Sequence, residues 1–167
     1  RLSLSRRCAD ITQSEIRAMS VECEKAGGIN LSQGVCDTPV PPEVRRGARE
    51  AIDAGANSYT RFDGVAELRE AIAAKLRAYN GIESDPEGEI VVSSGSTGSF
   101  YSACLALLDP GDEVIVFEPY YGYHVSTLLS VDAAPAFVRL QAPDWSFAPA
   151  DLERAITPRT KAIVLNT

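Results

Sequence analysis

Residues 89–124 read EIVVSSGSTGSFYSACLALLDPGDEVIVFEPYYGYH, and this stretch gives the strongest indication of the fold class. It contains a β-rich run (EIVVSS, 89–94), a loop of glycines and hydroxyl residues, an apolar segment typical of a helix (97–108), a Pro-Gly-Asp turn and a second β-rich run (113–118). A strand that leads through a short loop into a helix and then into another strand is the repeating unit of a parallel sheet. We therefore expect an α/β fold with a largely parallel sheet.

The segments on both sides of this stretch extend the pattern. Further strands are predicted at AFVRL (136–140) and KAIVLN (161–166). Apolar residues at helical spacing and suitable end signals predict further helices at about 13–27, 42–54, 64–80, 121–131 and 149–156. The first of these helices is predicted to begin with a capping box, Thr12 to Glu15. The charged residues Glu67, Arg69 and Glu70 are interpreted as a solvated face of the third.

Composition and charge exclude several classes of function. The chain has 16 basic and 23 acidic residues, a net charge of -7, which opposes binding to nucleic acid or an anionic membrane. No apolar run reaches the roughly 18 residues of a membrane span, and the first residues lack the apolar core of a secretory signal. The four cysteines are far apart and form no CxxC pair, so we expect no metal site and no disulfide framework. A cytoplasmic protein is predicted.

The loop of small residues is a candidate anion site. Gly95, Ser96 and Thr97 lie where a predicted strand passes into a helix, so unpaired N–H groups and the positive end of the helix dipole meet there. The two hydroxyl groups would add donors for a phosphate. The same residues also suit a simple helix cap, and the loop matches neither GxxxxGK[ST] nor GxGxxG. Considered alone, the loop leaves both interpretations open.

A group of aromatic residues follows the next predicted strand, at Phe117–His124. In a parallel sheet that strand end lies on the same side as the loop. An aromatic side chain there could stack on a planar ring whose phosphate occupies the loop. A phosphate joined to a planar ring points to pyridoxal phosphate. His124, the only histidine, is interpreted as a packing residue rather than a base.

Three segments, taken together, resemble the N-terminal part of the class I/II, fold-type I aminotransferases, which use pyridoxal 5'-phosphate. They are LSQGVCDTPVPPEV (31–44), NSYTRFDGVAELREAIA (57–73) and VVSSGSTGSFYSACLALLDPGDEVIVFEPYY (91–121). The resemblance implies that Gly95, Ser96 and Thr97 bind the cofactor phosphate and that Tyr121 stacks on its ring. It also implies an α/β sheet flanked by helices, here incomplete at the C-terminal end.

The resemblance assigns two further residues. Tyr59 corresponds to the tyrosine that reaches the cofactor phosphate of the neighbouring subunit, which implies a homodimer. Gly34 corresponds to the glycine whose backbone lies against the substrate carboxylate. Residues 1–45 would form an N-terminal arm belonging to a small domain, and residues 46–167 the first part of the large cofactor domain. The chain begins with Arg1 and ends within a predicted strand, so we expect a piece of a longer protein.

The activity implied by the resemblance is transfer of the amino group of an L-amino acid to a 2-oxo acid through pyridoxal phosphate. In the family, the Schiff-base lysine, the aspartate at the ring nitrogen and the arginine for the substrate carboxylate lie beyond the position of Thr167. No catalytic residue is therefore assigned in this chain. The open alternatives are a carbon–sulfur β-lyase or related lyase on the same cofactor, a non-catalytic dimerisation or phosphate-binding module, and a Rossmann-type nucleotide binder.

Overall fold

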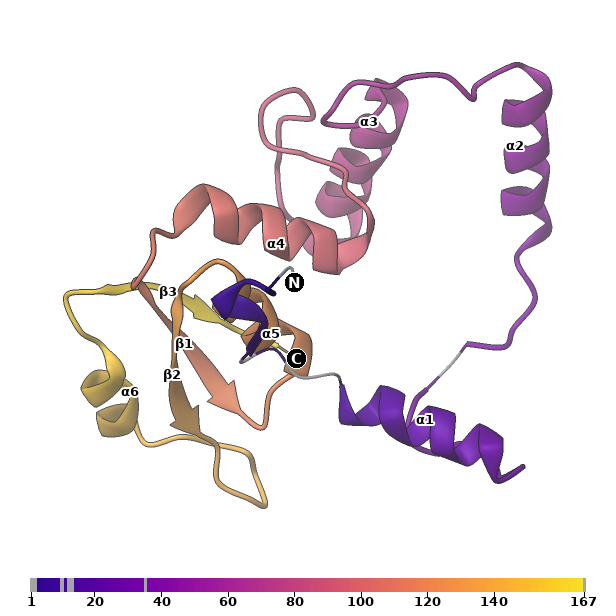
Figure 1. Ribbon diagram of the computed structural model, residues 1–167. Coiled ribbons are helices and arrows are strands. Elements are labelled where there is room, and N and C mark those ends of the chain that lie inside the picture. Colours follow the sequence, from indigo (N-terminus) through magenta and orange to yellow (C-terminus); the bar gives the residue numbers. More distant parts are fainter. Residues whose placement is uncertain (1–2, 10, 12–13, 35, 167) are drawn as a thin grey trace. The chain divides into compact units, whose positions relative to one another are not determined.

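The computed structural model describes residues 3–9, 11, 14–34 and 36–166 (Figure 1). The chain forms two compact units, one made of Arg1–Asn30 and Ser94–Thr167 and the other of Leu31–Ser93. The predicted division at residue 45 concerns the complete protein and stays a prediction.

The first unit contains a parallel three-stranded sheet in the order β2-β1-β3. Its strands are β1 (Glu113–Glu118), β2 (Ala134–Arg139) and β3 (Thr160–Val164). The central strand carries Val114, Ile115 and Val116, all almost completely buried. A continuous apolar run buried on both faces is typical of a central parallel strand. The predicted parallel α/β sheet is confirmed, with strand ends shifted by one or two residues in β2 and β3.

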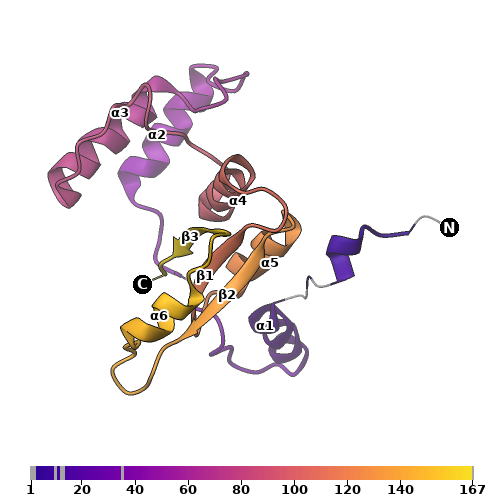
Figure 2. The ribbon, with the colours of Figure 1, turned by 90° about the vertical axis from the view of Figure 1, so that its left-hand side faces the viewer.

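Helices cover both faces of this sheet. Cys104 of α4 (Gly95–Leu107) and Leu128 of α5 (Gly122–Ser130) pack against Val114 and Val116 in the main apolar cluster. Figures 1 and 2 show α6 (Pro149–Ala155) on the opposite side of the sheet from α5. Burial of apolar side chains between these layers stabilises the unit, at roughly 1.5–3 kcal/mol for each fully buried aliphatic residue.

A buried carboxylate joins two strands of the sheet. The Thr157 hydroxyl donates to Glu113 Oε2 at 2.5 Å, and Arg159 Nε donates to Glu113 Oε1 at 2.8 Å. The Thr157 hydrogen bond and the Arg159 guanidinium lower the pKa of Glu113 below its ordinary value. Glu113 pairs with Thr160, so these contacts hold the start of β1 against the start of β3.

The N-terminal part of the first unit contains a short 3-10 turn (Arg6–Ala9) and the helix α1 (Glu15–Lys25). The predicted first helix is confirmed, but it begins at Glu15 with Ser14 as its N-cap. Thr12, the predicted first residue of the capping box, lies outside the described residues. None of the helices in the described part of the chain has the length and apolarity that a membrane span needs.

The second unit is mostly helical. It contains α2 (Pro42–Asp53), which begins with a proline in its first turn, and α3 (Ala66–Lys75), which continues into a π-helical turn (Leu76–Asn80). Gly81, at φ 68°, closes that turn in the left-handed conformation, as the Asn-Gly pair predicts. The predicted helices over 42–54 and 64–80 are therefore confirmed.

Two predictions in this region are wrong. Residues 89–94 do not form a strand: no described segment pairs with them along a sheet, and Val92 N–H instead donates to the Asp63 carbonyl at 3.0 Å. β-branched residues favour a strand only when a neighbouring strand supplies hydrogen bonds and packing. Arg69 is not solvated but completely buried: carboxylate and carbonyl oxygens from two loops contact its Nη1 and Nη2, while its Nε has no hydrogen-bond partner among the described residues.

Candidate functional site

The start of α4 presents a concentration of hydrogen-bond donors. Gly95, at φ +73°, turns the chain into the helix, and Ser96 and Thr97 follow in the exposed first turn. The N-cap residue Ser94 makes no side-chain hydrogen bond to this turn, and the turn contains no acidic residue. The first N–H groups of a helix have no partner inside the helix, and they carry a partial positive charge. This helix end can therefore accept an anion.

A group of rings lies beside it. Tyr121, the N-cap of α5, packs edge-on against His124 with ring centroids 5.3 Å apart, and His124 packs against Phe100 of α4 at 4.7 Å. Tyr121 also contacts Tyr123 at 5.2 Å and stays 42% exposed. These rings join the beginning of α5 to the first turns of α4.

The two helix ends share a small hollow of ≈ 40 Å³. It is lined by Ser96, Thr97, Phe100, Tyr121, Tyr123, His124 and Thr127. The structure therefore brings the predicted residues Ser96, Thr97 and Tyr121 together, as expected from the shared sheet edge. The volume is far below the about 300–1,000 Å³ of ordinary ligand pockets. The hollow itself is therefore too small for a ring-sized ligand.

The side chains that line the hollow carry no formal charge at neutral pH. Burial lowers the pKa of His124, so its imidazole is uncharged at neutral pH. Its Nδ1 is buried, and among the described residues it has no hydrogen-bond partner. Because none of the lining residues is a carboxylate, nothing in the hollow repels an anion at the start of α4.

Sequence reasoning did not assign Phe100 and Thr127 to this site. Their signal is the helical spacing: Phe100 lies one turn after Ser96 and Thr97, and Thr127 lies three residues after His124. The remaining predicted residues belong to the second unit. Tyr59 is completely exposed, with a relative exposure of 104%, and Gly34 lies in an exposed loop where an added Cβ would meet no atom within 4 Å.

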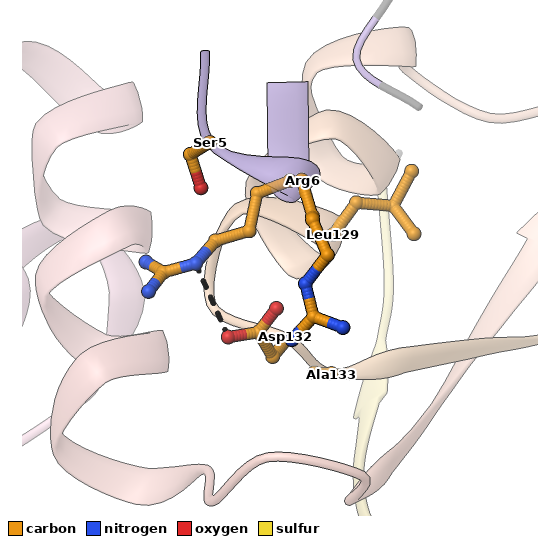
Figure 3. Close-up of a pocket in the computed structure, with 6 residues that line it drawn as sticks. Ser5, Arg6, Leu129, Asp132 and Ala133 are labelled. Atoms are coloured by element: carbon orange, nitrogen blue, oxygen red, sulfur yellow. Dashed lines mark ion pairs between the residues drawn. The ribbon is translucent and has the colours of Figure 1, made fainter. Parts of the chain in front are cut away.

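A second hollow lies under the N-terminal segment and shares no lining residue with the first. Figure 3 shows arginine side chains from the 3-10 turn reaching over Asp132, with an ion pair drawn as a dashed line. Arg7 Nε lies 3.2 Å from Asp132 Oδ2, and Arg7 Nη1 donates to the Ser130 carbonyl at 3.4 Å. These contacts fasten the segment to the turn between α5 and β2. Among the described residues, no group of three metal-ligating side chains is arranged to hold a metal ion.

Comparison with known proteins places these features in a family. The family model for aminotransferase class I and II matches residues 26–167. A probable N-succinyldiaminopimelate aminotransferase of Mycobacterium tuberculosis is 39% identical over 151 residues, 89% of this chain and 38% of the relative. An aspartate/prephenate aminotransferase of Nitrosomonas europaea is 37% identical over 172 residues, 99% of this chain and 43% of the relative. The chain thus spans about two fifths of the length of these relatives.

Solved structures agree with this result. The N-succinyldiaminopimelate aminotransferase from Mycobacterium tuberculosis superimposes with a TM-score of 0.88 at 35% identity, over 96% of this chain and 42% of that structure. The aspartate aminotransferase from Thermus thermophilus with maleate superimposes with a TM-score of 0.90 at 34% identity, over 100% of this chain and 45% of that structure. The chain therefore belongs to the aminotransferase class I and II family and has the α/β fold of the fold-type I enzymes.

Proposed function

We propose that the whole protein containing this chain is a pyridoxal-phosphate-dependent aminotransferase that moves the amino group of an L-amino acid to a 2-oxo acid, in the amino acid metabolism of the cytoplasm. One observation carries the proposal within this chain: the start of α4, with the exposed hydroxyl residues Ser96 and Thr97, lies beside the partly exposed ring of Tyr121. The relatives reported above are named as aminotransferases, which favours amino transfer over a carbon–sulfur lyase reaction.

The described residues fit the phosphate end of pyridoxal phosphate. The α4 start offers N–H donors, two hydroxyl groups and a helix-dipole end whose first turn contains no acidic residue. In this proposal Gly95, Ser96 and Thr97 bind the phosphate. Hydrogen bonds to a charged group are worth about 1.5–3 kcal/mol each. When bound, the cofactor supplies an electron sink for bond breaking next to the amino group.

The aromatic residues orient the ring in this proposal. The face of Tyr121 is available because the side chain is partly exposed, while His124 contacts its edge and limits its rotation. Offset stacking of aromatic rings contributes about 0.5–1.5 kcal/mol beyond burial. A neutral His124 adds no positive charge for the phosphate.

We further propose a homodimer in which Tyr59 reaches the cofactor phosphate of the partner subunit and Gly34 lies against the substrate carboxylate. The complete exposure of Tyr59 supports this role, since an aromatic side chain that is fully solvated in one chain is free to contact another. Residues 1–45 would belong to the arm and small domain, and 46–167 to the large domain. The named substrates of the relatives differ, so we propose no side-chain specificity.

The test uses the longest natural polypeptide that contains this chain. Purified protein is mixed with pyridoxal phosphate, a panel of L-amino acids and a 2-oxo acid acceptor, and the new amino acid is measured. Acceptor-dependent amino transfer supports the proposal. Release of a 2-oxo acid and ammonia from cystathionine without an acceptor would instead assign a lyase.

A binding measurement tests the site separately. Changing Ser96 to Ala and Thr97 to Val together should weaken pyridoxal phosphate binding by at least about 10-fold, because donors to a charged group are lost. Ser102→Ala, an exposed hydroxyl on the same helix, serves as the matched control and should leave the dissociation constant unchanged. Equal affinity in all three proteins would rule out the α4 start as the phosphate site.

A further inference from the structure

The second unit contains a completely buried cation, Arg69 of α3. A buried guanidinium is strongly unfavourable unless charged and polar oxygens surround it. Arg69 Nη1 donates to the Pro86 carbonyl at 2.6 Å and lies 3.4 Å from Asp63 Oδ2, and Nη2 donates to Glu87 Oε1 at 3.0 Å. Arg69 therefore joins three parts of the unit: helix α3, the loop before it and the loop after it.

A second arginine completes the cluster. Arg61 holds Asp63 with two hydrogen bonds, from Nε to Oδ1 at 3.0 Å and from Nη2 to Oδ2 at 2.7 Å. Its Nη1 donates to Glu87 Oε2 at 3.3 Å. Two guanidinium groups thus alternate with two carboxylates. Asp63 is almost fully buried, and the Arg61 hydrogen bonds lower its pKa, so it stays ionised.

The backbone around Asp63 is held as well. The Asp63 carbonyl accepts a hydrogen bond from Val92 N–H at 3.0 Å, and Gly64 N–H donates to the Arg61 carbonyl at 3.1 Å. Gly64, at φ +100°, lies so close to Val92 that a Cβ there would come within 2.7 Å of Val92 Cγ2. In Figure 1 the chain after α3 runs back beside this helix, as these contacts require.

Two aromatic residues of the same segment have the opposite character. Tyr59 and Phe62 are almost completely exposed, at 104% and 92%, although they lie next to the residues of the cluster. A segment that is held at one end has fewer conformations, which reduces the ordering cost of a contact made by its exposed aromatic side chains.

We propose that Arg69 is a positioning residue for Tyr59: by holding Asp63 and the 86–87 loop against α3, it fixes the segment from which Tyr59 reaches the partner subunit's cofactor phosphate. This inference rests on the proposed role of Tyr59. A lysine could not replace Arg69, because one ammonium on a flexible chain cannot meet oxygens on three sides as a planar guanidinium does.

Pyridoxal phosphate affinity of the longest natural polypeptide containing this chain tests the proposal. Tyr59→Phe removes the hydroxyl and should raise the dissociation constant about 10-fold. Arg69→Met and Arg69→Lys should each raise it about 2- to 10-fold, and no more than Tyr59→Phe, since the loop must then be ordered on binding. Arg77→Met, an exposed arginine of the same unit, is the matched control and should change nothing.

The double variant Arg69→Met/Tyr59→Phe tests whether Arg69 affects pyridoxal phosphate affinity through Tyr59. If Arg69 acts through Tyr59, then Arg69→Met should add no further loss in the Tyr59→Phe background. In the cofactor-free protein, hydrogen exchange at the Gly64 and Val92 amides should also be faster in Arg69→Met than in wild type. If Arg69→Met fails to fold, Glu87→Gln is used in its place. We expect it to cause a smaller loss of pyridoxal phosphate affinity, and this loss should also disappear in the Tyr59→Phe background.

Three results would overturn the proposal. The first is a folded Arg69→Met protein whose affinity for pyridoxal phosphate is unchanged. The second is a loss of affinity on Arg69→Met that is the same in wild type and in the Tyr59→Phe background. Either result would show that Arg69 does not position Tyr59, and both leave the role of Tyr59 intact. The third is an unchanged affinity in Tyr59→Phe itself. This result would rule out the proposed roles of Arg69 and of Tyr59, so the failure would lie in the proposed function.

Discussion

Gly64→Ala is a substitution for which the structure predicts a large local cost. Gly64 has a φ of +100°, where a side chain is strained, and an added Cβ would lie 2.7 Å from Val92 Cγ2 and 2.8 Å from Val92 Cβ. The backbone strain costs about 1–2 kcal/mol and the overpacking about 1–3 kcal/mol. The free energy of unfolding should therefore fall by about 2–5 kcal/mol.

Two other glycines of the same unit separate these contributions. Gly55 has a φ of +76° with no atom within 4 Å of an added Cβ, so Gly55→Ala should show the strain alone, about 1–2 kcal/mol. Gly47 lies inside α2 in open space, so Gly47→Ala should stabilise the protein by about 0.5–1 kcal/mol. Combining Gly64→Ala with Val92→Ala should relieve only part of the overpacking, because Val92 Cβ remains.

Urea denaturation followed by circular dichroism measures all four variants. The slope of the unfolding free energy with urea should stay constant, so that the differences report stability. If Gly64→Ala costs no more than Gly55→Ala, the contact with Val92 does not restrain the loop, and the rigid base assigned to the Tyr59 loop would be wrong.

Other substitutions test the first unit. Leu128→Ala, in the fully buried core, should destabilise by about 2–5 kcal/mol in the same denaturation assay. Because the pKa of Glu113 is lowered in the folded state, its contribution to stability is present above the unfolded pKa of about 4.3 and is lost as the pH falls through the folded value. In Glu113→Gln the free energy of unfolding should therefore decrease less steeply with falling pH below about pH 4 than in wild type. An equally steep decrease in both proteins would contradict this. Asp132 has φ 59° and pairs with Arg7; in an Arg7→Met background Asp132→Gly should stabilise by about 1–2 kcal/mol, which thermal unfolding can check.

The local elements follow from the sequence wherever the signal is a repeated spacing or a turn residue. Strand β1 occupies the predicted residues 113–118, and α4 begins within the run of small residues that predicts it. The site residues Ser96, Thr97 and Tyr121 could be grouped because parallel strands end at one edge of a sheet. Burial could not be predicted at charged positions. Arg69 looks like a surface residue of an amphipathic helix, and only its partners Asp63, Pro86 and Glu87, which lie up to 18 residues away, make its burial favourable.

The order of the helices and of β1 to β3, the parallel sheet and the small-residue helix start can be predicted from the sequence, because they depend on propensities and periodicities within a few residues. Three features follow from tertiary packing alone: 89–94 is not a strand, His124 contacts both Tyr121 and Phe100, and Arg69 is buried. Each of these depends on which distant groups supply hydrogen bonds, apolar contact or opposite charge. Such partners are brought together by packing, and local sequence does not encode their distances.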